Sequence, residues 1–75
     1  MAALPKTILE QIRRKNYPSK YCSWKDLQTQ FALNGYGKGK FVKWLEYFCQ
    51  NGILEEASRG EDGIIFYCPM WEYDL

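Results

Sequence analysis

The fold is decided by residues 35–56, which read GYGKGKFVKWLEYFCQNGILEE. Apolar side chains recur three, four and seven positions apart in this stretch, at Phe41, Leu45, Phe48 and Cys49, with Trp44 on the flank. This spacing predicts a helix with one buried side. The pair Asn51-Gly52 predicts its end, because glycine accepts the left-handed conformation that a helix C-terminus demands.

The opposite side of the same helix carries a row of polar and basic residues. These residues are also three and four positions apart, so they share one exposed face: Lys40, Lys43, Tyr47 and Gln50. A basic row with an aromatic member suits contact with a negatively charged partner.

A turn with glycine at alternate positions, Gly35, Gly37 and Gly39, precedes this helix. Such a turn is either a flexible link between two helices or a phosphate-gripping turn, in which backbone N–H groups approach an anion. It is not a nucleotide-binding P-loop, because the Gly-Lys-Ser/Thr ending is missing.

Two more helices are expected earlier in the chain. Thr7 and Glu10 form a capping box for the first, whose apolar side is Ile8, Leu9 and Ile12; it ends near Asn16-Tyr17-Pro18. Ser23 and Asp26 cap the second, which ends at Asn34-Gly35. Only a minor strand fits between them, at residues 20–22.

The basic trio Arg13, Arg14 and Lys15 lies at the C-terminal end of the first helix. Positive charge there complements the helix dipole, which is a purely structural role. Contact with phosphate groups is the functional alternative, and the residues alone leave both open.

After Gly52 the sequence predicts a β-hairpin. Residues 53–57 and 64–68 are the expected strands, and Asp62-Gly63 in the join is a common turn pair. Pro69 ends the second strand. The remaining residues, 70–75, form an aromatic-acidic tail that either folds back on the core or offers a patch to a partner.

Length and composition indicate one small domain, residues 1–75, with a core of about 7–69. Aromatic residues make up 17% of the chain, and their rings supply much of the burial that a small core needs. No apolar run reaches the roughly 18 residues of a membrane span, and the N-terminus lacks the apolar core of a signal peptide. We therefore expect no membrane partner and an intracellular location, in the cytoplasm or nucleus.

The chain has three cysteines, Cys22, Cys49 and Cys68, and no histidine. Free thiols are expected, with an intermolecular disulfide as the alternative; Cys49 and Cys68 are expected in the core. The spacing provides too few metal ligands, and no catalytic residue stands out. We predict that the protein is not an enzyme and uses no cofactor.

Charge is distributed unevenly although the net charge is only +1. Residues 1–45 carry a net charge of +7, and residues 46–75 carry −6. The molecule is therefore expected to be basic at one end and acidic at the other. Opposite ends of two copies could meet, so a homodimer is a possible assembly.

The order helix, short strand, helix, helix, hairpin resembles the winged helix-turn-helix superfamily over residues 7–69. The resemblance is carried by the start of the second helix at 23–27, the third helix at 41–50 and the turn into the hairpin at 51–55. It implies a small α+β domain with three helices and a C-terminal β-hairpin wing.

The resemblance also implies a function. In that superfamily the third helix usually enters the major groove of double-stranded DNA, and the wing touches the DNA backbone or minor groove. A chain of this size would be a minimal regulator of transcription, or a factor of a phage or mobile element. The positions that match the DNA-contacting elements are Lys25, Gln28, Lys38, Lys40, Lys43, Tyr47, Gln50 and Arg59.

The hairpin departs from that pattern because it carries two carboxylates, Glu61 and Asp62, which repel phosphate. An acidic wing suits a protein-interaction module instead. The alternative function is therefore an adaptor that binds another protein through its wing and tail, with Glu61, Asp62, Trp71 and Tyr73 as the contacts.

Overall fold

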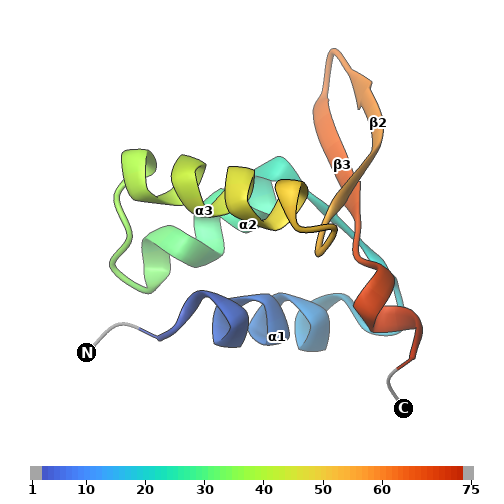
Figure 1. Cartoon of the computed structure of the whole chain (residues 1–75), viewed down its shortest axis with the longest axis horizontal. Coiled ribbons are helices and arrows are strands. Elements are labelled where there is room, and N and C mark those ends of the chain that lie inside the picture. The colour runs from blue at the N-terminus through green and yellow to red at the C-terminus, as the bar shows by residue number, and fades with distance from the viewer. Residues whose placement is uncertain (1–2, 74–75) are drawn as a thin grey trace.

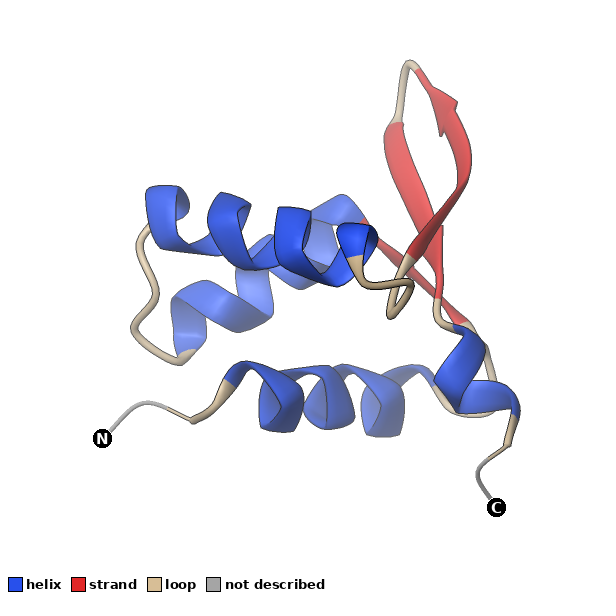
Figure 2. Cartoon of the chain, in the orientation of Figure 1, coloured by secondary structure: helices blue, strands red, loops and turns tan. Residues whose placement is uncertain are grey.

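The computed structural model describes residues 3–73, which form three helices and a three-stranded antiparallel sheet (Figures 1 and 2). The elements are α1 (Pro5–Asn16), β1 (Tyr21–Ser23), α2 (Trp24–Leu33), α3 (Lys38–Gln50), β2 (Glu55–Gly60), β3 (Gly63–Tyr67) and a short 3-10 helix, η1 (Pro69–Glu72). The prediction of a small α+β domain with three helices and a C-terminal β-hairpin is confirmed at this level.

The sheet has the strand order β1-β3-β2, so the short strand between the first two helices pairs with the second strand of the hairpin. β3 is therefore the central strand. Its residue Phe66 lies between Cys22 on one side and Glu56 on the other. Both Cys22 and Phe66 are buried, so this face of the sheet is the one that meets the helices.

The hairpin projects away from the helices, while α1 and α3 lie on opposite sides of the helical part (Figure 1). All three helices contribute to one core. Its buried members are Ile8, Leu9, Ile12, Cys22, Leu27, Phe31, Phe41, Phe48, Leu54, Phe66, Cys68 and Trp71. The apolar stripe expected on the first helix is thus confirmed.

Phe31 of α2 lies at the centre of the aromatic part of this core. Its ring centroid is 5.3 Å from that of Phe41, 6.5 Å from that of Phe48 and 5.2 Å from that of Tyr36. Aromatic pairs at tilted or edge-on angles in this range add stabilisation to that of burial. Phe31 therefore fixes the position of α3 against α2.

Helices α2 and α3 both end at an Asn-Gly pair, as predicted. Gly35 and Gly52 have φ of 88° and 72°. The side-chain amides of Asn34 and Asn51 each donate to a carbonyl of the last helical turn at 2.8 Å. Each of these carbonyls also accepts the backbone N–H of the same asparagine, and the glycine that follows lets the chain reverse direction.

The predicted capping box at the start of the first helix is wrong. α1 begins at Pro5 with Leu4 as its N-cap, and no side chain caps it. Proline suits this place because it has no N–H to satisfy. Glu10 instead pairs with Arg13 at 3.6 Å. The predicted cap at the start of the second helix is confirmed, since the Ser23 hydroxyl accepts the N–H of Asp26 at 3.0 Å.

The hairpin strands begin and end at different residues from those predicted. β2 begins at Glu55, because the N–H groups of Ile53 and Leu54 donate to the carbonyl of Phe48 at 2.9 and 3.2 Å. Those two residues close the end of α3 and cannot join the sheet there. The second strand of the hairpin covers residues 63–67, so Cys68 follows it. The N–H of Cys68 still donates to the backbone carbonyl of Lys20.

The prediction that Cys49 belongs to the core is wrong, since its side chain is exposed. Cys49 is one residue beyond buried Phe48, which turns it by about 100° around the helix axis. Cys22 and Cys68 are buried free thiols. Burial raises the pKa of Cys22 to about 12 and also raises the pKa of Cys68, so both stay protonated.

The tail folds back in part. Trp71 lies in η1 and is only 5% exposed, whereas Tyr73 is 87% exposed. The fold-back alternative therefore holds for Trp71, which is part of the core and not an exposed contact of the predicted adaptor surface. Residues 74 and 75 of the predicted tail lie outside the described residues.

Among the helices described within residues 3–73, none is both long and apolar enough to cross a membrane.

We expect Trp71→Ala to lower the free energy of unfolding by about 3–5 kcal/mol, because it empties a buried site in the core. Urea unfolding followed by far-UV circular dichroism measures this change. Tyr73→Ala is the matched control two residues later, and it should change stability by less than about 0.5 kcal/mol. Equal effects of the two substitutions would contradict the folded-back position of Trp71.

Candidate nucleic-acid interface

The basic row predicted on the third helix, which we call the α3 row below, is exposed on the outer side of α3. Phe41 and Phe48 anchor the inner side of α3 in the core, and the four row residues are exposed on the helix, at Lys40, Lys43, Tyr47 and Gln50. The structure thus brings these four predicted residues together on one surface. Two ammonium groups, one phenol and one amide give it charge, a ring face and three kinds of hydrogen-bond donor.

Tyr47 is held in place by its aromatic neighbours although it is 48% exposed. Its ring lies 5.5 Å from that of Trp44 in an edge-on arrangement and 6.0 Å from that of Phe48. A side chain supported in this way loses less conformational freedom on binding than an isolated one. Tyr47 is therefore the most preorganised member of the row.

The start of α3 adds one further lysine, Lys38, to this surface. Gly37 is the N-cap and no side chain caps the helix, so the first backbone N–H groups have no acceptor within it. Lys38 and Lys40 lie exposed in the same turn. No acidic residue is present in that turn. The positive end of the helix dipole and two ammonium groups thus coincide.

The glycine turn is shorter than the sequence suggested, because α3 begins at Lys38 and includes Gly39. A Cβ added at Gly37 or Gly39 would have no atom within 4 Å, so neither glycine is needed for packing within the described chain. Only Gly35 of the three has a positive φ.

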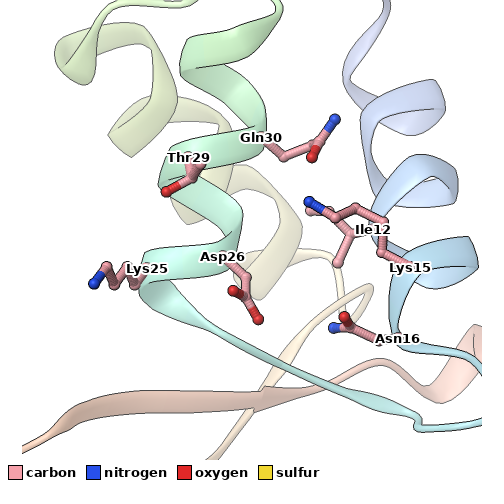
Figure 3. Close-up of a pocket in the computed structure, with 7 residues that line it drawn as sticks. All are labelled: Ile12, Lys15, Asn16, Lys25, Asp26, Thr29 and Gln30. Carbon is pink, nitrogen blue, oxygen red and sulfur yellow. The ribbon is translucent and has the colours of Figure 1, made fainter.

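The residues predicted on the second helix, Lys25 and Gln28, belong to α2 and not to the α3 row. Gln28 is half-buried, and Lys25 is exposed in the first turn of α2. Lys25 borders a cleft of about 250 Å³ between α1 and α2, which the sequence did not predict. Figure 3 shows Asp26 pointing into this cleft and Lys25 pointing away from α1; the other lining residues are Ile12, Lys15, Asn16, Thr29 and Gln30.

Lys15 is the member of the predicted basic trio that lies in this cleft, opposite Asp26 (Figure 3). Arg13 is half-buried and pairs with Glu10, which favours a structural role for it. The sequence singled out Lys15 as part of the basic trio, but it did not predict the cleft, which depends on how α1 packs against α2.

Arg59 is held by an acidic neighbour. Its guanidinium donates to both carboxylate oxygens of Glu56, at 3.1 and 2.8 Å. Residues three apart on a strand normally face opposite ways, but a bulge at Ala57 turns both side chains to one face. The pKa of Glu56 falls because of this pair, and Arg59 is less free to bind phosphate than predicted.

The hairpin loop is acidic, as predicted. Glu61 and Asp62 are exposed between Gly60 and Gly63, which face each other across the hairpin. Gly63 has a φ of 118°, which an L side chain rarely adopts. Asp62 also borders a cleft of about 290 Å³ with Lys25 and Trp24. The loop is therefore a poor surface for phosphate.

The outer face of the sheet carries a pair of tyrosine side chains that the sequence did not predict to lie together. Tyr21 and Tyr67 are direct neighbours across β1 and β3, with ring centroids 5.5 Å apart. The Tyr67 hydroxyl donates to Glu72, which also pairs with Lys20 at 3.6 Å. β3 reads GIIFY, with no alternation of apolar and polar residues, and its partner strand is distant in sequence, so no sequence pattern indicated this face.

The part of the chain described, residues 3–73, holds no group of three or more side chains suited to a metal ion. The chain matches no protein-family model, no curated protein and no solved structure. The physical features of the surface are therefore the basis for a functional proposal.

Gly39→Ala should raise the free energy of unfolding by about 0.5–1 kcal/mol, because alanine favours a helix and no atom obstructs its Cβ. Gly37→Ala should lower it by a similar amount, because alanine is a poor N-cap. Urea unfolding of both variants measures the two effects. A loss of stability in Gly39→Ala would contradict the position of this residue inside α3.

Hydrogen bonding to Glu72 and its negative charge raise the pKa of Tyr67 to about 12, from 10.0. The folded state favours the neutral phenol, so its stabilising contribution is full below pH 10 and is lost as pH rises through about 12. Glu72→Gln should shift the pKa of Tyr67 back toward 10. NMR of the tyrosine ring carbons measures this shift, and an unchanged pKa in the variant would contradict the contact.

Proposed function

We propose that this chain is a winged-helix domain that binds double-stranded DNA with α3 in the major groove. A major groove admits an α-helix, and the exposed side of this one carries groups that suit phosphates and base edges. A role in regulating transcription, or in a phage or mobile-element process, is the setting that we propose for it.

The observation that carries the proposal is the α3 row. Lys40 and Lys43 suit phosphate or guanine contacts, Gln50 can pair with adenine through its amide, and Tyr47 offers a ring face. The inner side of the same helix is anchored by Phe41 and Phe48. Binding would therefore require little rearrangement of the row.

Two further features support the winged-helix part of the proposal. The short strand β1 precedes α2 and pairs with β3, so the hairpin is attached to the helical part through the sheet. The chain between α2 and α3 is short, covering residues 34–37. This arrangement is compatible with a helix-turn-helix unit followed by a wing.

The proposed binding mode depends on α3 and gives the hairpin little part in it. Arg59 is paired with Glu56, and Glu61 and Asp62 would face phosphate with negative charge. We therefore propose that the hairpin points away from the DNA, or contacts it weakly.

The double variant Lys40→Ala/Lys43→Ala should weaken binding to all duplex sequences alike and lower the salt slope by about two, one for each lost phosphate contact. Anisotropy titrations of a labelled duplex at several salt concentrations measure both quantities. Lys6→Ala/Arg14→Ala removes the same charge from exposed positions on α1, and it should change the slope little. Equal losses of affinity and salt slope in the two double variants would contradict a contact through the α3 row and would indicate non-specific attraction.

Gln50→Ala should relax sequence preference with only a small loss of average affinity, because an amide that pairs with adenine discriminates by about 1–3 kcal/mol. Selection from a random duplex pool, with the native protein and the variant in parallel, reveals the change. Identical selected sequences would exclude Gln50 from base recognition.

A second candidate function is a protein adaptor. The observation that favours it is the exposed acidic loop, Glu61 and Asp62, in a hairpin whose one arginine is already paired. Tyr73 remains an exposed candidate contact, whereas Trp71 does not. Removal of the chain after Pro69 is a poor test of this function, because it also removes a buried core residue.

A further inference from the structure

The outer face of the sheet is built from side chains that stand next to one another across three strands. Tyr67 of β3 is opposite Tyr21 of β1 on one side and Glu55 of β2 on the other. Directly opposed residues in a sheet point to the same face. Two tyrosine rings and one carboxylate therefore lie in a single row, which we call the tyrosine face.

The tyrosine face is open. The helices pack against the opposite side, where Phe66 and Cys22 are buried, while Tyr21 is 49% exposed and Ile65 is 37% exposed. A cleft of about 370 Å³ runs beside the rings, and it is lined by Tyr21, Glu55, Glu56, Ala57, Tyr67 and Glu72. An exposed sheet face with two rings and a hollow beside them suits a partner.

The charges around the tyrosine face decide what kind of partner fits. Glu72 pairs with Lys20, and Glu56 pairs with Arg59. Glu55 has no ion-pair partner among residues 3–73, so one carboxylate next to Tyr67 remains available. A cation above the rings would meet both the ring faces and this carboxylate.

We propose that the tyrosine face binds an arginine- or lysine-containing segment of another protein, with the cationic side chain over Tyr21 and Tyr67 and paired with Glu55. A guanidinium fits best, because it stacks on aromatic rings and pairs with a carboxylate in one plane. This interaction is separate from the α3 row, so it does not depend on DNA binding.

The test is an NMR titration of the 15N-labelled chain with a capped hexapeptide of alternating arginine and serine. Backbone amide shifts should concentrate at Tyr21, Glu55 and Tyr67, and the α3 row should stay unchanged. A hexapeptide of alternating glutamate and serine should cause no such shifts. Shifts spread evenly over all carboxylates, or none at all with the arginine peptide, would overturn the proposal.

Matched variants separate a specific site from general attraction. Glu55→Gln should weaken peptide binding by about two- to fivefold, the range of an exposed ion pair, whereas Glu61→Gln makes the same charge change in the hairpin loop and should not. Tyr21→Leu should also weaken binding by about two- to fivefold, whereas Tyr73→Leu, which alters another exposed ring, should not. Equal losses within either pair would overturn the proposal.

A second copy of the chain is the other source of a basic segment. Sedimentation velocity of the native protein without peptide distinguishes the two. We expect a monomer over the concentrations used for NMR. Self-association that Glu55→Gln weakens would replace the proposed partner by another copy of this chain.

Discussion

The structure depends most on the burial of Phe31 between the helices. This ring is 1% exposed and contacts Phe41 and Phe48, the two residues that anchor α3. The carbonyl of Phe31 also accepts the N–H of Tyr36 at 3.0 Å, which closes the end of α2. One residue thus fixes the contact between α2 and α3 and the turn that joins them. A chain of 75 residues has few such contacts, so each one matters for its thin stability.

The anchoring of α3 from within determines what the molecule presents outside. Because Phe41 and Phe48 face the core, the opposite side of the helix, with its lysines, faces away from it. The acidic residues lie mainly in the hairpin and in η1, on other elements. A small protein can in this way carry a basic surface and an acidic surface at once. The proposed DNA contact and the proposed contact with a basic segment therefore use different parts of the fold.

The sequence predicted the features that depend on neighbouring residues. The Asn-Gly helix ends, the Ser23 cap and the α3 row all follow from spacing within a few turns of chain. It failed for the start of β2, although the residues that decide it are also close in sequence. Ile53 and Leu54 close α3 through the Phe48 carbonyl, which no strand pattern reveals.

The two candidate sites differ in how far apart in sequence their residues lie. The α3 row was visible in the sequence because a helix repeats every three to four residues. The tyrosine face was not, because β1 and β3 are more than 40 residues apart and meet only through the register of the sheet. The pairing of Arg59 was hidden too, since the bulge at Ala57 is what turns it toward Glu56.

The central claim, that the outer side of α3 binds duplex DNA, is tested most directly by fluorescence anisotropy of a labelled duplex with the native protein across a salt series. The account predicts affinity tighter than about micromolar near physiological salt, and a log–log slope that corresponds to the release of several counterions. Anisotropy that stays flat even at low salt would contradict it, and the lysines of α3 would then be a solvated surface.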